Sequence, residues 1–168
     1  MGQASLAAGM DKARLRTAIL EKLQTELETI TRAALTSRDE ATHEESKPEN
    51  QYDMHAQEAA YLAEGQARLA AELNETLALY NALQLPAWAT TAPVSIGAVV
   101  TLESAQRTAR YFMGPRSGGM ELTVDGLEIT VVTPASPLGR QLLGAKLNAV
   151  VQLPGRGGSV AYRVVNVE

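Results

Sequence analysis

Apolar residues recur at intervals of three and four along the first part of the chain, which predicts a long amphipathic helix. No Gly or Pro interrupts this pattern before a polar, acidic stretch begins near residue 42. A stripe this narrow covers one partner helix and does not cover a wide core. The stripe starts after Asp11 and consists of Leu15, Ile19, Leu23, Leu27, Ile30 and Ala34.

A second stripe of the same kind predicts a second helix from about residue 48 to residue 85. Gly65 lies inside it and costs roughly 1 kcal/mol relative to Ala if exposed. Two long helices with a short polar connection predict an antiparallel hairpin over residues 11–85, and therefore a monomer. The alternative is that copies of the chain associate with one another through these apolar stripes. The apolar positions of the second helix are Leu62, Leu69, Leu73, Leu77, Tyr80 and Leu83.

The hydrophobic period changes after Pro86 and Pro93, which bracket a predicted linker over residues 86–93. Short β-branched runs then predict antiparallel strands, with Asp125-Gly126 as a hairpin turn. The final strand pair is connected through residues 154–158. The predicted strands cover residues 94–102, 110–113, 120–124, 127–133, 149–153 and 159–167.

One short helix is predicted between these strands, from Ser136 to Gly144. Ser136 can accept hydrogen bonds from the first free N–H groups, and Pro137 suits the first helical position. Gly144 suits the left-handed residue that follows a helix. The fold class is therefore α+β, a helical hairpin followed by a small antiparallel-sheet domain over residues 94–168. Residues 1–10 are interpreted as a flexible leader.

Charge and composition narrow the classes of partner. The net charge is −4; residues 1–93 contribute −6 and residues 94–168 contribute +2. This balance argues against stable, sequence-specific nucleic-acid binding, because the acidic half would repel phosphates. No apolar run is long enough to cross a bilayer, so no membrane partner is expected. The absence of Cys excludes disulfides and thiolate catalysis and agrees with a cytoplasmic location.

The polar connection, residues 42–53, is the candidate site because carboxylates crowd into it. Such a hairpin tip either repels its surroundings or binds a cation. The sequences Thr42-x-x-Glu45 and Ser46-x-x-Glu49 also match capping boxes, so these glutamates could instead satisfy the N–H groups at a helix start. His43 and His55 flank the tip, but their spacing is a weak metal signal and favours surface positions. The acids from residue 39 onward are Asp39, Glu40, Glu44, Glu45, Glu49 and Asp53.

The chain resembles the bacterial Gre transcription elongation factors over nearly its whole length from about residue 11. The run over residues 96–102 is similar to the family's first strand, Gly-x-x-Val-x-Val. The strongest likeness is to the family signature Ser-Pro-Ile/Leu-Gly/Ala-Arg-x-Leu-Leu/Ile-Gly, which the chain matches with Ser136-Pro137-Leu138-Gly139-Arg140-Gln141-Leu142-Leu143-Gly144.

The resemblance implies that residues 94–168 form a domain like that of the FK506-binding proteins, docked outside the secondary channel of RNA polymerase. Peptidyl-prolyl isomerase activity is not expected, because this half offers only Tyr111, Phe112 and Tyr162 for an aromatic pocket. The hairpin would enter the channel, where its acidic tip helps to hold a second Mg²⁺ in the polymerase active site. The polymerase core is thus the implied partner, and backtracked RNA, which the polymerase cleaves, is met only indirectly.

The family's tip motif, Gly-Asp-Leu-Lys-Glu-Asn, aligns with residues 45–50. Glu49 and Asn50 match its Glu-Asn, whereas Ser46 stands at the position of its Asp. We therefore expect Glu45 and Glu49 to assist the metal, with Glu44, Ser46, Asn50 and Asp53 as secondary candidates. On this interpretation the chain is an accessory factor with neither an active site nor a cofactor of its own.

Two other functions stay open. The serine at position 46 is also compatible with a regulator that enters the channel, stimulates no cleavage and competes with other channel factors. A coiled-coil module with an unrelated partner is the third possibility. The weakly positive second half leads us to expect that Arg140, Lys146 and Arg163 contact the polymerase rim.

Overall fold

The computed structural model describes residues 9–45, 53–87, 89, 91–155 and 157–168, so most of the predicted leader lies outside it. The two predicted parts are both present: two long helices come first, and a six-stranded sheet with one short helix follows. Contacts divide the chain into two compact units. One comprises Ile19–Asn81, and the other comprises the residues up to Ala18 together with Ala82–Glu168.

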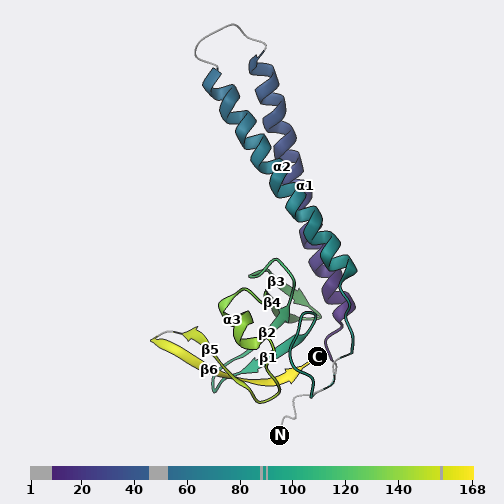
Figure 1. The fold of residues 1–168 in the computed structure, drawn as a ribbon, viewed down its shortest axis with the longest axis vertical. Helices are drawn as coiled ribbons and strands as arrows, with labels where there is room; N and C mark the ends of the chain where they lie inside the picture. The colour runs from purple at the N-terminus through teal and green to yellow at the C-terminus, as the bar shows by residue number, and fades with distance from the viewer. Residues whose placement is uncertain (1–8, 46–52, 88, 90, 156) are drawn as a thin grey trace. The chain divides into compact units, whose positions relative to one another are not determined.

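The helical hairpin consists of α1, Lys12–Glu45, and α2, Asp53–Ala82, which run side by side (Figure 1). Asp11 caps α1, because its Oδ1 accepts hydrogen bonds from the N–H groups of Ala13 at 3.0 Å and Arg14 at 3.1 Å. The predicted stripe of α1 is confirmed. Leu15, Ile19 and Leu23 are buried, and Leu27, Ile30 and Ala34 are partly buried.

The second stripe is correct only near the end of α2. Tyr80 is buried, and Leu73, Leu77 and Leu83 are partly buried. Leu62 and Leu69, however, are 55% and 48% exposed, so their assignment to the seam is wrong. In this half of α2 the inward-facing positions belong instead to small and polar residues, which a pattern of large apolar residues does not reveal. They are Ala59, Ala63, Gln66 and Ala70.

The helix bounds also differ from the prediction. α2 ends at Ala82 rather than near residue 85, and the following carbonyl groups bond to the start of α1. The Arg16 guanidinium donates to the Leu83 carbonyl at 3.2 Å, and Lys12 Nζ donates to the Pro86 carbonyl at 2.7 Å. These bonds hold the segment after α2 against the first turns of α1, within one compact unit.

The sheet has the strand order β3-β4-β2-β1-β6-β5. All neighbouring strands are antiparallel except β2 and β4, which pair in parallel, so the expectation of a fully antiparallel sheet needs this correction. The strands β3 and β5 form the two edges. The bounds are β1 Val99–Glu103, β2 Thr108–Met113, β3 Glu121–Val124, β4 Leu127–Val132, β5 Val150–Gly155 and β6 Gly158–Val167.

Local signals set the turns of this domain. Asp125 and Gly126 have φ of 51° and 78° and join β3 to β4 as a two-residue hairpin turn, as predicted. The first strand starts later than expected, at Val99. A turn precedes it, in which Ala98 N–H donates to the Ser95 carbonyl at 3.1 Å and Gly97 has φ of 93°.

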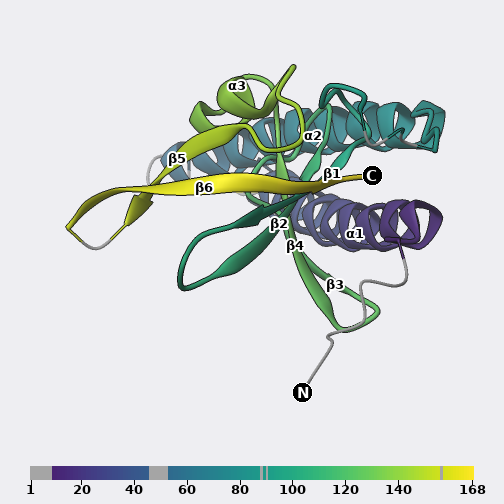
Figure 2. The ribbon, with the colours of Figure 1, turned by 90° about the horizontal axis from the view of Figure 1, so that it is seen from below.

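The short helix α3, Pro137–Leu142, forms as the sequence predicts and lies beside the edge strand β5 (Figure 2). Ser136 Oγ accepts from Gly139 N–H at 3.0 Å and donates to the Thr133 carbonyl at 2.8 Å. Gly144 follows the helix with φ of 80°. Leu142 is fully buried and joins the main core cluster with Val94, Ala98, Val100, Leu102, Met113, Val132, Val151, Val164 and Val167.

Gly65→Ala is expected to stabilise the hairpin. A Cβ atom built at Gly65 meets nothing within 4 Å. Alanine also loses less backbone entropy than glycine when it enters a helix, so the free energy of unfolding should rise by roughly 0.5–1 kcal/mol. Urea denaturation followed by far-UV circular dichroism measures the change, and a lower midpoint would contradict it.

The same substitution in α3 should have the opposite effect. At Gly139 a Cβ atom would overlap the backbone carbonyl of Thr133, which cannot move without disrupting the Ser136 cap. Gly139→Ala is therefore expected to lower the free energy of unfolding by about 1–3 kcal/mol, as overpacking does elsewhere. The paired comparison separates steric contact from helix propensity, since propensity favours alanine at both positions.

Candidate functional site

The acidic segment, residues 42–53, overlaps the end of α1 and the start of α2. Glu44 and Glu45 are the last two residues of α1, and Asp53 is the first residue of α2. Ser46, Glu49 and Asn50 lie outside the described residues. The structure therefore puts three of the six tip candidates on helices that form one hairpin, and their predicted role stays a prediction.

Thr42 does not begin a helix, so the first of the two capping boxes is wrong. α1 continues through this position to Glu45. The Thr42 hydroxyl donates back along the helix, to the carbonyl of Arg38 at 2.7 Å and that of Asp39 at 3.1 Å. Helix capping at an N-terminus consequently does not explain Glu45. The second box, which starts at residue 46, falls outside the described residues.

The helix dipole favours an acid at one of these helix ends and disfavours acids at the other. A helix C-terminus carries partial negative charge, so the two acids at the end of α1 are electrostatically unfavourable there. A helix N-terminus carries partial positive charge, which favours an acid such as Asp53 at the start of α2. Helix stability accounts for Asp53 but gives no reason for Glu44 and Glu45.

No group of three or more His, Cys, Asp or Glu residues within the described ranges could hold a metal ion. His43 lies in α1 and His55 lies in α2. None of the helices in this part of the chain combines the length and the apolar character needed to cross a membrane.

The three predicted partner-binding cations lie on three different segments of the second domain. Arg140 is in α3, Lys146 precedes β5 and Arg163 is in β6, and all three residues are exposed. The Arg140 guanidinium donates to the Ala135 carbonyl at 2.6 Å, which holds its side chain close to the start of α3.

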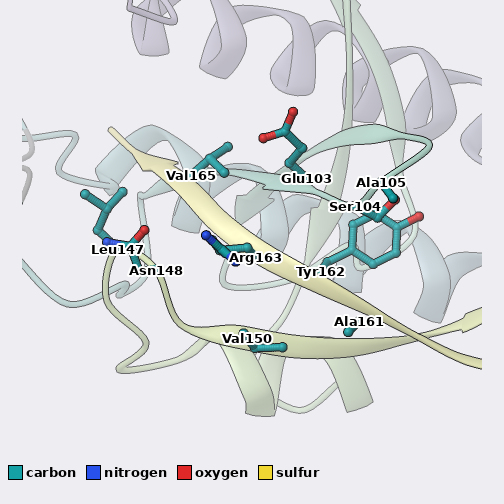
Figure 3. A pocket seen from close by; sticks show the side chains of 10 residues that line it. All are labelled: Glu103, Ser104, Ala105, Leu147, Asn148, Val150, Ala161, Tyr162, Arg163 and Val165. Atoms are coloured by element: carbon teal, nitrogen blue, oxygen red, sulfur yellow. The ribbon is translucent and has the colours of Figure 1, made fainter.

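Arg163 lines an open groove of about 520 Å³ on the β1–β6–β5 side of the sheet (Figure 3). In the strand register it pairs with Glu103 of β1 and with Val150 of β5. Leu147 and Val150 also line the groove and are 38% and 60% exposed. Neither of these two residues was predicted as part of a site. For Val150, the sequence of two consecutive valines at 150 and 151 does not reveal which one faces outward.

A second groove of about 470 Å³ lies between α3 and the strands β4 and β5. Its wall includes Leu138 and Leu153. The side-chain amide of Gln141 makes the two hydrogen bonds to β5 that the backbone of a neighbouring strand would make. Gln141 Nε2 donates to the Gln152 carbonyl at 3.0 Å, and Gln141 Oε1 accepts from Gln152 N–H at 2.8 Å. This pairing satisfies backbone groups of the edge strand β5, which would otherwise be open to another chain.

Burial shifts two titratable groups in this part of the molecule. It raises the pKa of the Tyr111 phenol, with Arg107 opposing the shift and Tyr162 adding to it. It lowers the pKa of Lys12, and the negative charge of Glu168 opposes that change. Both groups belong to the unit that carries the sheet, so they do not bear on the acidic segment.

Comparison with known proteins gives a family for the second domain. Residues 89–168 match the model of the C-terminal domain of the transcription elongation factors GreA and GreB. A comparison with curated protein sequences gives no match.

Several solved structures are similar to the chain. The GreA factor homolog 1 (Gfh1) of Thermus thermophilus is 20% identical, with 89% of this chain and 94% of that one covered and a TM-score of 0.35. Gfh1 of Thermus aquaticus is also 20% identical, with coverages of 88% and 92% and a TM-score of 0.37. The elongation factor GreA/GreB of Nitrosomonas europaea is 16% identical, with coverages of 56% and 77% and a TM-score of 0.33.

The match over residues 89–168 covers the short helix with its Ser136 cap and all six strands. Residues 89–168 therefore belong to the family of GreA/GreB C-terminal domains.

Proposed function

We propose that this protein binds RNA polymerase, inserts its acidic hairpin tip into the secondary channel and stimulates cleavage of backtracked RNA by the polymerase. The observation that carries the proposal is the position of Glu44 and Glu45 at the C-terminal end of α1. Carboxylates are disfavoured there by the helix dipole, so a role outside the hairpin accounts for them better than stability does.

The donor chemistry suits a magnesium ion. Mg²⁺ prefers carboxylate oxygens, keeps several waters and is commonly held by only one or two protein carboxylates together with substrate phosphates. Glu45 and Glu49 would supply those carboxylates, and the remaining ligands would come from the polymerase. When bound in such a site, the ion stabilises the charge that develops on the oxygens during phosphoryl transfer. The contribution of this chain is to carry the carboxylates on a long hairpin.

One observation favours a second candidate, a channel regulator that does not stimulate cleavage. Ser46 stands where the family's motif has Asp, and a serine hydroxyl carries no charge for a cation. Such a protein would share the docking mode and would act by excluding other factors from the channel. The two candidates differ in RNA cleavage and agree in polymerase binding.

The proposed role of the tip predicts a specific loss on mutation. In a stalled, backtracked elongation complex at saturating factor, wild type should stimulate RNA cleavage. Glu45→Ala with Glu49→Ala should reduce the stimulated rate by at least about tenfold, a loss of about 1.4 kcal/mol in transition-state stabilisation. Gel analysis of the shortened RNA gives the rate, and binding to the polymerase should be retained.

A matched control removes two acids from α1 far from its C-terminal end. Glu21→Ala with Glu26→Ala changes the net charge equally and should leave cleavage unchanged. Equal losses in both double variants would show that overall charge, not the tip, matters. Binding of wild type without any stimulated cleavage would exclude the first candidate and support the regulator.

The docking role of the second domain predicts a change in affinity. Neutralising Arg140, Lys146 and Arg163 together, each to Gln, should weaken binding to core polymerase by at least about threefold at low salt, because exposed charge pairs contribute a few tenths of a kcal/mol each. Titration with fluorescently labelled factor measures the dissociation constant. The variant Arg107→Gln with Arg110→Gln is the control, and equal weakening by both variants would argue for a non-specific charge effect.

A further inference from the structure

The half of α2 nearest to its start carries two stripes that could each face α1. The seam in the structure uses Ala63 and Ala70, which are partly buried. The residues immediately before them, Leu62 and Leu69, are 55% and 48% exposed. Successive residues of an α-helix differ by about 100° in direction, so a rotation of about that angle would bring the leucine stripe into the direction that the alanine stripe has in the structure.

Both stripes continue the seam at the other end of α2. There Thr76 is buried and Leu77 is partly buried, so two successive residues flank the same seam. Leu69 and Leu62 lie one and two heptads before Thr76. The two alanines lie one and two heptads before Leu77. Both stripes have the spacing of a coiled-coil seam, so the period alone does not choose between them.

Gln66 belongs to both stripes and can act as the fixed point between them. Its side-chain Oε1 accepts a hydrogen bond at 3.3 Å from the hydroxyl of Ser37, which is only 6% exposed. A partly buried polar pair of this kind fixes the register of two helices along their length. It sets which residues lie at the same level and allows α2 to rotate about its own axis.

The facing surface of α1 accommodates small neighbours. Ala41 is 7% exposed, and Ala33 and Ala34 are partly buried. Alanine against alanine lets the helices approach closely and gains packing contacts, whereas leucine against alanine buries more apolar area at a larger separation. Close packing of the small residues favours one arrangement, and burial of more apolar area favours the other.

We propose that this half of α2 has two packings on α1, related by rotation about the axis of α2. In one, Ala63 and Ala70 face α1, as in the structure; in the other, Leu62 and Leu69 do. Rotation would change the orientation of the start of α2 relative to the end of α1. The acidic segment connects these two helix ends. The exchange is a property of the isolated chain and does not depend on polymerase binding.

Disulfide trapping tests this directly, because the natural chain contains no cysteine. The Ser37–Gln66 level places Ala41 across from Leu62 and Ala63. The double variant Ala41→Cys with Ala63→Cys, the alanine-stripe pair, reports the first packing. The double variant Ala41→Cys with Leu62→Cys, the leucine-stripe pair, reports the second. We expect both pairs to oxidise within one chain under a glutathione redox buffer, as resolved by non-reducing electrophoresis.

The decisive step adds Leu69→Glu to each pair, since a glutamate at this position cannot enter the seam. The yield from the leucine-stripe pair should fall about tenfold or more, because burial of one leucine favours a packing by more than that factor. The yield from the alanine-stripe pair should stay the same or rise. Leu79→Glu is the matched control; it changes an exposed leucine near the other end of α2 and should alter neither yield.

Three results would overturn the proposal. The leucine-stripe pair could fail to oxidise while the alanine-stripe pair oxidises, which shows one packing only. Its yield could be independent of residue 69, which shows simple fluctuation. It could also give bonds between chains, in which case the leucines face a second copy. Far-UV circular dichroism of each variant checks that the hairpin is folded.

Discussion

The narrow contact between α1 and α2 is the constraint on which the whole helical hairpin depends. A helix of 34 residues and one of 30 residues each bury a single stripe, so nearly all of their remaining surface is exposed. In proteins, most of the stability of a helix comes from the packing of its apolar face and not from helix propensity. The seam therefore determines both whether the hairpin forms and which way its end points. Large apolar residues build it near the start of α1 and the end of α2, and small residues with one Ser–Gln hydrogen bond build it toward the acidic segment.

The second domain depends on interactions of a different kind, which are local and mutually consistent. Ser136 caps α3, Gly139 lies against the Thr133 carbonyl, and Gly144 takes the left-handed conformation after the helix. The Gly144 N–H then donates to Val94, whose own N–H donates to Ala145, so the helix end is fastened to the entry of the domain. Each residue serves the local conformation and the core together, as expected for a sequence that specifies one structure.

This difference explains what could be read from the sequence. The α1 stripe, the Asp125-Gly126 turn and the capped helix α3 were predictable because residues a few positions apart decide them. The parallel pairing of β2 with β4, the late start of β1 and the outward position of Leu62 and Leu69 depend on contacts between distant segments, so a periodic pattern could not give them. The same holds for the site. The acidic residues could be identified from the composition of the sequence alone. The groove beside Arg163 could not be predicted in this way, because it depends on the register of three strands.

The two conflicts between local preference and observed position both lie in the part of the hairpin that leads to the acidic segment. Leucines at heptad spacing face solvent there while alanines face the partner helix, and glutamates occupy a helix end that disfavours negative charge. Selection for stability alone would place the leucines inside and a lysine or arginine at the end of α1. The stability of the hairpin therefore does not account for either feature. The second domain shows no such conflict at its capped helix or its hairpin turn. Stability therefore accounts for the sequence at those sites, in contrast to the part of the hairpin that leads to the acidic segment.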